Sequence, residues 1–280
     1  DNSGTMQYVR IVEGGFEVAP DEEINGLTLA GVGSGTTIDH IQVTGGRDDG
    51  IEWFGGAASV KHFVITTAED DSIDFDLGWQ GNLQFGIVIQ GPVANRGIES
   101  DNNGNELNAT PRTRPTIANI TMVGRSEKAA AMHREGMGGF IHNSIYTGFG
   151  TCLISEDDTA VARSTPRELV YNNVILDCET SVGAVDGNDN LVANELFNAD
   201  QPAGRIIEEA VSLNADFIAT AGQAAAKNFT LDPSGGGQIA DSVNTADSNF
   251  LESTDYVGAV NPDGSDLWFE GWTIPGSLSF

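Results

Sequence analysis

The strongest constraint on this chain is a short apolar segment that recurs at nearly constant spacing. Its copies begin at residues 38, 60 and 83, which are 22 and 23 residues apart, and related copies begin at residues 117, 141 and 170. A second, Asp-rich segment follows the first at the same period, over residues 48–54, 70–76 and 95–101. Two segments sharing one period define a repeating unit with at least two strands.

The repeat length selects the fold class. A propeller blade needs about 40 residues or more, so a period near 22 with short strand-like segments favours a solenoid. We predict an all-β parallel β-helix with about 22 residues per coil.

The third position of the first segment forms a column when the repeats are stacked. Coils in register lie about 4.8 Å apart, so identical amides can hydrogen-bond from coil to coil and satisfy a sharp turn. We expect a structural ladder along this column, formed by His40, His62, Asn119, Asn143 and Asn172, with Phe85 between the His and Asn members.

The Asn column and the segments at 48–56, 70–76, 78–82, 254–259 and 271–273 resemble a group of secreted bacterial proteins. These have the right-handed parallel β-helix of the pectate-lyase-like class, and the resemblance covers roughly residues 6–190. It implies this fold and an extracellular location or a place on a bacterial outer surface. It implies an activity much less strongly, although the class suggests polysaccharide cleavage.

The domain organisation follows from where the repeat holds and where it decays. Residues 1–200 are predicted to form the β-helix, with residues 6–11 and 27–29 as a first coil and 13–24 as an inserted loop. The beginning shows no capping unit, so either preceding coils have been removed or another chain covers that end. Residues 201–280 are predicted to continue the same domain with a short helix at 205–213 and an aromatic-rich capping segment over the last coils.

The charge balance excludes several partners. The 280 residues carry 13 Lys and Arg against 41 Asp and Glu, a formal net charge of -28. Nucleic acids and anionic membranes are therefore poor partners, because both require clustered basic residues. No apolar run of 18 residues is present, so we expect no membrane span.

The Asp-rich segment predicts a metal site. Strand alternation turns Ile51 and Trp53 inward and Glu52 outward, so equivalent acids should stack from coil to coil. Like charges about 4.8 Å apart repel by roughly 1 kcal/mol in water and about 3–4 kcal/mol at an effective dielectric constant near 20. Such a column favours Ca²⁺, which prefers oxygen ligands; the alternative is a set of solvated turns. The candidate ligands are Asp48, Asp49, Glu52, Asp70, Asp71, Asp74, Asp76, Glu99 and Asp101.

Candidate catalytic residues are sparse. A lyase would need Ca²⁺ or an arginine to neutralise the carboxylate of a uronate, and also a side chain that acts as a base. The candidates for these two roles are Lys61, Arg47, Arg96, His133 and Arg134. A surface ion pair with Asp39 is the preferred interpretation of Lys61, and a turn role is preferred to metal binding for His40 and His62. A hydrolase could use two acids among Asp74, Asp76 and Asp101.

The two cysteines, Cys152 and Cys178, lie 26 residues apart, or about one coil. If they stack, their Cα atoms should be about 5–6 Å apart, which suits a disulfide. Two buried free thiols are the alternative.

The sequence therefore favours a non-catalytic, extracellular structural protein of a bacterial surface, matrix or filament, stabilised by Ca²⁺. Its solenoid ends offer a route to head-to-tail self-assembly. The alternatives are a polysaccharide lyase or hydrolase and a carbohydrate-binding adhesin. A binding protein should expose aromatic rings such as Trp53 or Trp79.

Overall fold

The computed structural model describes residues 1–19, 24–125, 127–155, 169–184, 206–218 and 250–280. Its regular structure consists of strands, and these residues contain no helix. Accordingly, no helix able to cross a membrane occurs among them.

The strands form two sheets in which every pairing is parallel. The larger, 10-stranded sheet contains β1 (Thr5–Val12), β3 (Thr37–Thr44), β5 (Ser59–Thr66), β7 (Asn82–Ile89), β9 (Thr116–Val123), β11 (Gly139–His142), β12 (Ile145–Thr147), β14 (Leu169–Asn172), β15 (Val174–Asp177) and β17 (Ile206–Glu208). The 7-stranded sheet contains β2 (Leu27–Ala30), β4 (Ile51–Phe54), β6 (Ile73–Asp76), β8 (Ile98–Ser100), β10 (Ala129–His133), β13 (Thr151–Ser155) and β16 (Thr180–Ala184).

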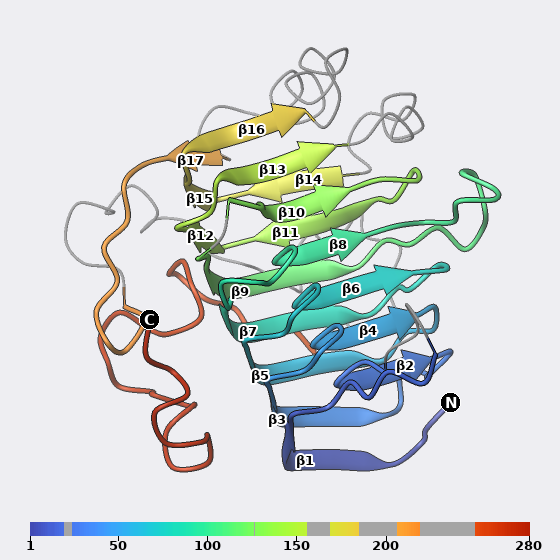
Figure 1. Ribbon diagram of the computed structural model, residues 1–280, viewed down its shortest axis with the longest axis horizontal. Coiled ribbons are helices and arrows are strands. Elements are labelled where there is room, and N and C mark those ends of the chain that lie inside the picture. Colours follow the sequence, from blue (N-terminus) through green and yellow to red (C-terminus); the bar gives the residue numbers. More distant parts are fainter. Residues whose placement is uncertain (20–23, 126, 156–168, 185–205, 219–249) are drawn as a thin grey trace.

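The chain alternates between the two sheets and climbs by one strand at each turn, as Figure 1 shows. Strands β3 and β5 begin at Thr37 and Ser59, which reproduces the repeat of 22 residues. The predicted parallel β-helix is confirmed.

Each long strand of the 10-stranded sheet bends at one residue with a positive φ angle. These φ angles lie between 46° and 62°, in the left-handed region that Asn tolerates better than most residues. The bend divides the coil into two arms, which become separate strands at β11 and β12 and again at β14 and β15. The bend column consists of Tyr8, His40, His62, Phe85, Asn119, Asn143 and Asn173.

The prediction of Asn172 as a member of this column is wrong by one residue. Asn172 still belongs to β14 and pairs with His142 of β11. Asn173 makes the bend, and its Nδ2 donates to Oδ1 of Asn143 at 2.9 Å. Asn173 therefore makes the side-chain hydrogen bond to the neighbouring coil that was expected of Asn172.

The interior of the coils is a stack of apolar side chains in register. Ile51 and Ile73 pair with each other, as do Trp53 and Phe75, and all four are buried. Trp79 stacks on Trp53 with ring centroids 4.7 Å apart, and both rings are 0% exposed. The exposed Trp53 or Trp79 that a carbohydrate-binding protein should show is therefore not found, because both rings fill the core.

The helix predicted at 205–213 is also wrong within the part that the structure describes. Residues 206–208 form β17, which pairs with β15 and places Ile206 beside Val174 and Ile207 beside Ile175. The apolar spacing that suggested a helix instead supplies a strand to the edge of the sheet. Backbone hydrogen bonds to β15 stabilise these residues more than a short helix would, because a short helix has few hydrogen bonds of its own.

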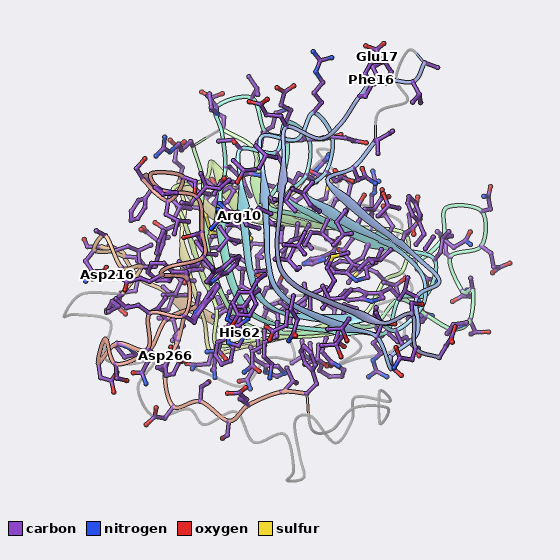
Figure 2. All side chains as sticks on the ribbon, turned by 90° about the horizontal axis from the view of Figure 1, so that it is seen from below. Arg10, Phe16, Glu17, His62, Asp216 and Asp266 are labelled. Atoms are coloured by element: carbon purple, nitrogen blue, oxygen red, sulfur yellow. A yellow bond between two sulfur atoms is a disulfide. The ribbon has the colours of Figure 1, made fainter. Side chains whose placement is uncertain are left out.

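The C-terminal segment, residues 250–280, lies along the outer face of the 10-stranded sheet (Figure 1) and is called the strap. Its Ala259, Val260, Phe269 and Trp272 form one buried cluster with Val64, Ile87 and Ile89 of β5 and β7. Figure 2 shows the labelled Arg10 and His62 on the side of the solenoid that the strap covers. The aromatic segment was expected over the last coils. Its large rings lie over earlier ones, with Trp272 beside His40 and Trp268 beside His62, whereas its Val257 packs against Ile145 and Ile175 of later coils.

Polar side chains of successive coils hold the strap in place. Gln84 accepts a hydrogen bond from the backbone N of Glu252 at 2.7 Å and donates to its carbonyl at 2.8 Å. Asn119 Nδ2 donates to the carbonyl of Gly258 at 3.1 Å, and Asn143 Nδ2 donates to Oγ1 of Thr254 at 3.1 Å. The bend column thus forms part of the strap's binding surface.

Cys152 and Cys178 form the disulfide that their one-coil spacing suggests. Their Cα atoms are 5.5 Å apart. The bond joins β13 to the residue directly after β15, near the end of the solenoid opposite β1.

Candidate metal centre on the seven-stranded sheet

Stacked carboxylates follow the outer face of β4, β6 and β8. Glu52 pairs in register with Asp74, and Asp74 pairs with Glu99. Their strand neighbours Ile51, Ile73 and Ile98 are fully buried in the coil interior. Alternation along each strand therefore places these acids in one outward column, the acidic ladder, as the sequence predicts.

A second group of acids lies at the turn that precedes these strands. Asp49 Oδ1 accepts a hydrogen bond from the backbone N of Asp71 at 3.0 Å. Asp71 Oδ1 accepts one from the backbone N of Arg96 at 2.6 Å. Each carboxylate thus links its coil to the next through one oxygen, and its second oxygen is a further acceptor.

Together these acids give three groups of ligand atoms lying within 4.8 Å of one another. The groups share members, so they form one continuous acidic site along three coils. Their members are Asp48, Asp49 and Asp70; Asp49, Asp71 and Asp74; and Asp74, Glu99 and Asp101.

The electrostatics of this site favour a bound proton or cation. Burial, reinforced by the neighbouring carboxylates, raises the pKa of Asp49 and of Asp74 to about 9. Burial likewise raises the pKa of Glu52 and of Asp76 to about 7. It raises the pKa of Asp71 well above its ordinary value, with Glu99 and Asp49 as further causes. Several of these groups hold protons at neutral pH unless a cation takes their place.

Two arginines neutralise one end of the site. Arg134 forms a bidentate pair with Asp101 at 2.6 and 2.7 Å, and its Nη2 lies 2.5 Å from Glu99 Oε2. Arg96 Nη1 lies 2.6 Å from Glu99 Oε1 and 3.7 Å from Asp71 Oδ2. The less compensated carboxylates are therefore those on β4 and β6 and Asp49 at the turn before β4.

The donor set fits a hard divalent cation. All of the groups are carboxylates, and Asp74 Oδ1 and Asp76 Oδ1 are buried without a hydrogen-bond partner among the described residues. Calcium is bound by six to eight such oxygens, with water completing the shell. Asp49, Asp71 and Asp74 would hold the ion, and Glu52 and Asp76 are available beside them.

Asn25 is a residue of the acidic site that could not be recognised from the acidic repeat. It lies just before β2, and its Nδ2 donates to Oε2 of Glu52 one coil further on. The available signal was its place two residues before β2, in which Thr28 pairs with Glu52.

Of the remaining catalytic candidates, Lys61 and His133 lie away from the acidic site, whereas Arg47 directly precedes Asp48 in the chain. Lys61 is on the opposite sheet, where its Nζ contacts Glu252 at 3.0 Å and lies 4.8 Å from the ring centroid of Phe250. The predicted ion pair of Lys61 with Asp39 is therefore wrong, because Lys61 turns toward the strap. Arg47 is exposed at the turn before β4.

His133 points into the core. Its side chain contacts Ser100 Oγ and Tyr171 Oη, each at 2.5 Å, and the residue is 1% exposed. Burial lowers its pKa to about 3. A surface substrate cannot reach this ring, so His133 is not positioned to act as a base.

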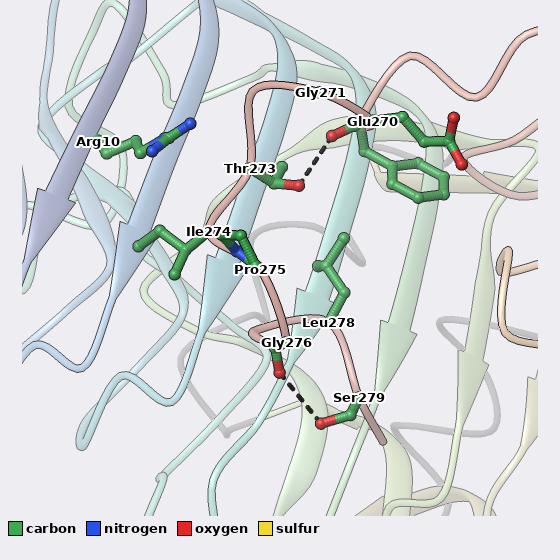
Figure 3. A pocket seen from close by; sticks show the side chains of 10 residues that line it. Arg10, Glu270, Gly271, Thr273, Ile274, Pro275, Gly276, Leu278 and Ser279 are labelled. Atoms are coloured by element: carbon green, nitrogen blue, oxygen red, sulfur yellow. Dashed lines mark hydrogen bonds between the residues drawn. The ribbon is translucent and has the colours of Figure 1, made fainter.

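A cavity of about 530 Å³ lies between β1 and the strap, away from the acidic site (Figure 3). Its wall includes Arg10, Phe269, Ile274, Pro275 and Leu278. Arg10 is its one basic residue, and its Nε donates to the carbonyl of Trp272.

The two sheets and the acidic site define an acidic parallel β-helix protein. A sequence model of the pectate-lyase like beta helix domain matches residues 1–273, which is nearly the whole chain. The chain therefore belongs to this family, and the match includes the solenoid and the strap as far as residue 273. Comparisons with curated proteins and with solved structures find no match.

Proposed function

We propose that this chain is a non-catalytic, extracellular structural protein of a bacterial surface, matrix or filament, in which Ca²⁺ joins neighbouring coils. The observation that carries the proposal is the continuous acidic site, where carboxylates from three coils lie beside one another and several of them are buried. A divalent ion between them would replace repulsion by attraction. Because the site requires stacked coils, the ion would bind the folded state preferentially and stabilise it.

The placement of the basic candidates supports a structural role. Lys61 is engaged by the strap, His133 is buried, and Arg96 and Arg134 form ion pairs with the acidic site. These contacts hold coils together and leave the side chains little freedom to act on a substrate.

The ends of the solenoid support the assembly part of the proposal. Strand β1 pairs with β3 and β17 pairs with β15, and each has an outer edge without a strand partner among the described residues. Parallel edges of this kind can pair with another copy, and a head-to-tail contact between unlike ends extends into a filament.

Calcium binding can be tested by titration calorimetry and thermal unfolding, with metal-stripped protein in EDTA as the reference. At a free Ca²⁺ concentration 100 times Kd we expect roughly 2.7 kcal/mol of added stability. This corresponds to a Tm increase of roughly 5–10 °C. Calcium should also displace protons at pH 7, because burial raises the pKa of Asp49 and Asp74 to about 9.

The variant Asp74→Asn provides the specific test. It should weaken Ca²⁺ binding at least about tenfold while leaving Tm in EDTA unchanged or higher, because the carboxyl of Asp74 must take up a proton on folding at neutral pH and asparagine need not. Glu270→Gln, an exposed acid of the strap, is the matched control and should bind Ca²⁺ as the unaltered chain does. Equal Tm values in Ca²⁺ and EDTA for the unaltered chain would contradict the proposal.

One observation favours an alternative function on polysaccharides. The side chains of Arg96 and Arg134 are 23% and 28% exposed beside the acidic site, where a cation and an arginine could together bind a uronate. Release of unsaturated uronates, seen by ultraviolet absorbance with acidic polysaccharides and Ca²⁺, would establish a lyase. Retention on immobilised polysaccharide without cleavage would establish an adhesin.

A further inference from the structure

A second cluster of metal-binding side chains lies on the opposite sheet, away from the acidic site. It consists of Asp39, His40 and His62, whose ligand atoms lie within 4.8 Å of one another. Asp39 and His40 belong to β3, and His62 occupies the equivalent bend position of β5.

The bend geometry brings the two rings together. His40 and His62 have φ angles of 55° and 53°, and their ring centroids are 4.5 Å apart. Because the two residues have the same backbone conformation one coil apart, their side chains point in the same direction from the sheet. Both Nδ1 atoms thereby approach a single carboxylate oxygen, Asp39 Oδ1, at distances of 2.9 Å for His40 and 2.8 Å for His62.

The carboxylate of Asp39 is not taken by the neighbouring cation. Lys61 pairs with Asp39 in the sheet register, but its ammonium group contacts Glu252 of the strap. The two imidazoles are therefore the partners of Asp39. The exposed Asp266 of the strap acts electrostatically on His40 and adds negative charge (Figure 2).

Aromatic rings hold both imidazoles in position. Tyr8 stacks on His40 at 4.5 Å, and Phe85 stacks on His62 at 5.2 Å. The strap adds Trp272 at 5.3 Å from His40 and Trp268 at 5.3 Å from His62. The side chains of His40 and His62 are 15% and 17% exposed, so the cluster is enclosed but accessible to an ion.

We propose that Asp39, His40 and His62 form a binding site for one first-row transition-metal ion of the Zn²⁺ type. Two imidazole nitrogens and one carboxylate oxygen suit Zn²⁺ and are a poor set for Ca²⁺, which prefers oxygen. Ligands about 2.1 Å from a tetrahedral ion are about 3.4 Å apart, so the observed contacts need to open by about half an ångström. Three protein ligands leave a coordination position for water.

The test uses the whole chain, stripped of metal and then supplied with excess Ca²⁺ so that the acidic site is saturated. Zinc is titrated by calorimetry, and bound metal is measured after gel filtration. The expected result is one Zn²⁺ per chain. Cobalt in place of zinc should give the visible absorption of a four-coordinate ion with nitrogen ligands. This site is independent of the Ca²⁺ proposal, so either can fail without the other.

The ligand variants are His40→Asn, His62→Asn and Asp39→Asn. Asparagine keeps the bend, since Asn119 and Asn143 occupy the same column. Each variant should weaken Zn²⁺ binding by more than about 100-fold, because even loss of an outer partner typically costs 10–100-fold. Asp255→Asn makes the same change as Asp39→Asn at an exposed acid of the strap outside the cluster; it is the matched control and should stay within about threefold of the unaltered chain.

A measurement on the unaltered chain covers the case in which a variant fails to fold. Diethyl pyrocarbonate modifies accessible imidazoles, and mass spectrometry locates the products. Zinc should suppress modification of both His40 and His62. Unchanged modification in Zn²⁺, or unweakened Zn²⁺ binding by folded His40→Asn and His62→Asn variants, would overturn the proposal.

Discussion

Asn119 shows how one residue type meets two demands in this fold. It adopts a left-handed backbone with φ of 54°, and its side chain is fully buried. Its Oδ1 accepts hydrogen bonds from Gln84 Nε2 at 3.2 Å and from Thr254 Oγ1 at 3.1 Å. The bend in the coil and the attachment of the strap therefore depend on the same amide.

Asn119→Ala and Asn119→Gly should separate these two contributions. Both lose the buried hydrogen bonds, at a cost of about 2–3 kcal/mol, because the partners stay buried and unpaired. Alanine adds roughly 1–2 kcal/mol for the left-handed backbone, which glycine adopts freely. Urea unfolding should therefore rank the variants as Asn, then Gly, then Ala in decreasing stability. Equal losses for Gly and Ala would show that the bend carries no strain.

The sequence predicted this column but not every member of it. A position shared by His40, His62 and Asn119 can be read from the period alone. The adjacent pair Asn172 and Asn173 offers the same side chain at both positions, so the sequence cannot decide between them. The register of β14 with β11 decides it, because it keeps Asn172 within the strand.

At the scale of strands, the acidic site makes the stability of the fold depend on pH. The pKa of Asp49 and of Asp74 rises from 3.8 in the unfolded chain to about 9 in the fold. Between these values the folded state binds more protons than the unfolded state, so the free energy of unfolding falls as pH rises. The stabilisation is complete below pH 3.8 and is lost as pH rises through about 9.

We therefore expect Tm in EDTA to fall steadily from pH 5 to pH 9, by several degrees. Saturating Ca²⁺ should reduce this fall, because the cation replaces the protons, and its stabilising effect should be larger at pH 8 than at pH 5. Differential scanning calorimetry across this range measures both effects. The Asp74→Asn variant should show a shallower fall in EDTA, and a fall as steep as in the unaltered chain would argue against this assignment.

Strand pairing and strap position illustrate what a repeat pattern leaves undetermined. The alternation in β4 and β6 predicted correctly which side chains point inward. The strap has no period, so its position depends on contacts made only in the fold, such as those of Gln42 and Gln84. The β17 residues have spacing compatible with either helix or strand, and the free edge of β15 selects strand.

At the scale of the whole molecule, the solenoid presents different surfaces at its two ends. The β1 end exposes the apolar side chains Tyr8, at 63%, and Val12, at 51%, beside an unpaired edge within the described residues. The other end presents β17 and the coil in which the Cys152–Cys178 disulfide joins β13 to the residue after β15. Contact between unlike ends would continue the 10-stranded sheet from one copy into the next.

This arrangement predicts concentration-dependent growth of linear assemblies in Ca²⁺, which light scattering and electron microscopy would detect. The double variant Tyr8→Lys and Val12→Lys should prevent growth, because charged side chains at a strand edge oppose pairing. Val93→Lys makes the same chemical change at a residue 69% exposed between β7 and β8, on the side of the solenoid, and should leave growth intact. Monomers of the unaltered chain at all concentrations, or equal inhibition by Val93→Lys, would show that the ends do not mediate association. The structural role would then rest on individual β-helices stabilised by calcium.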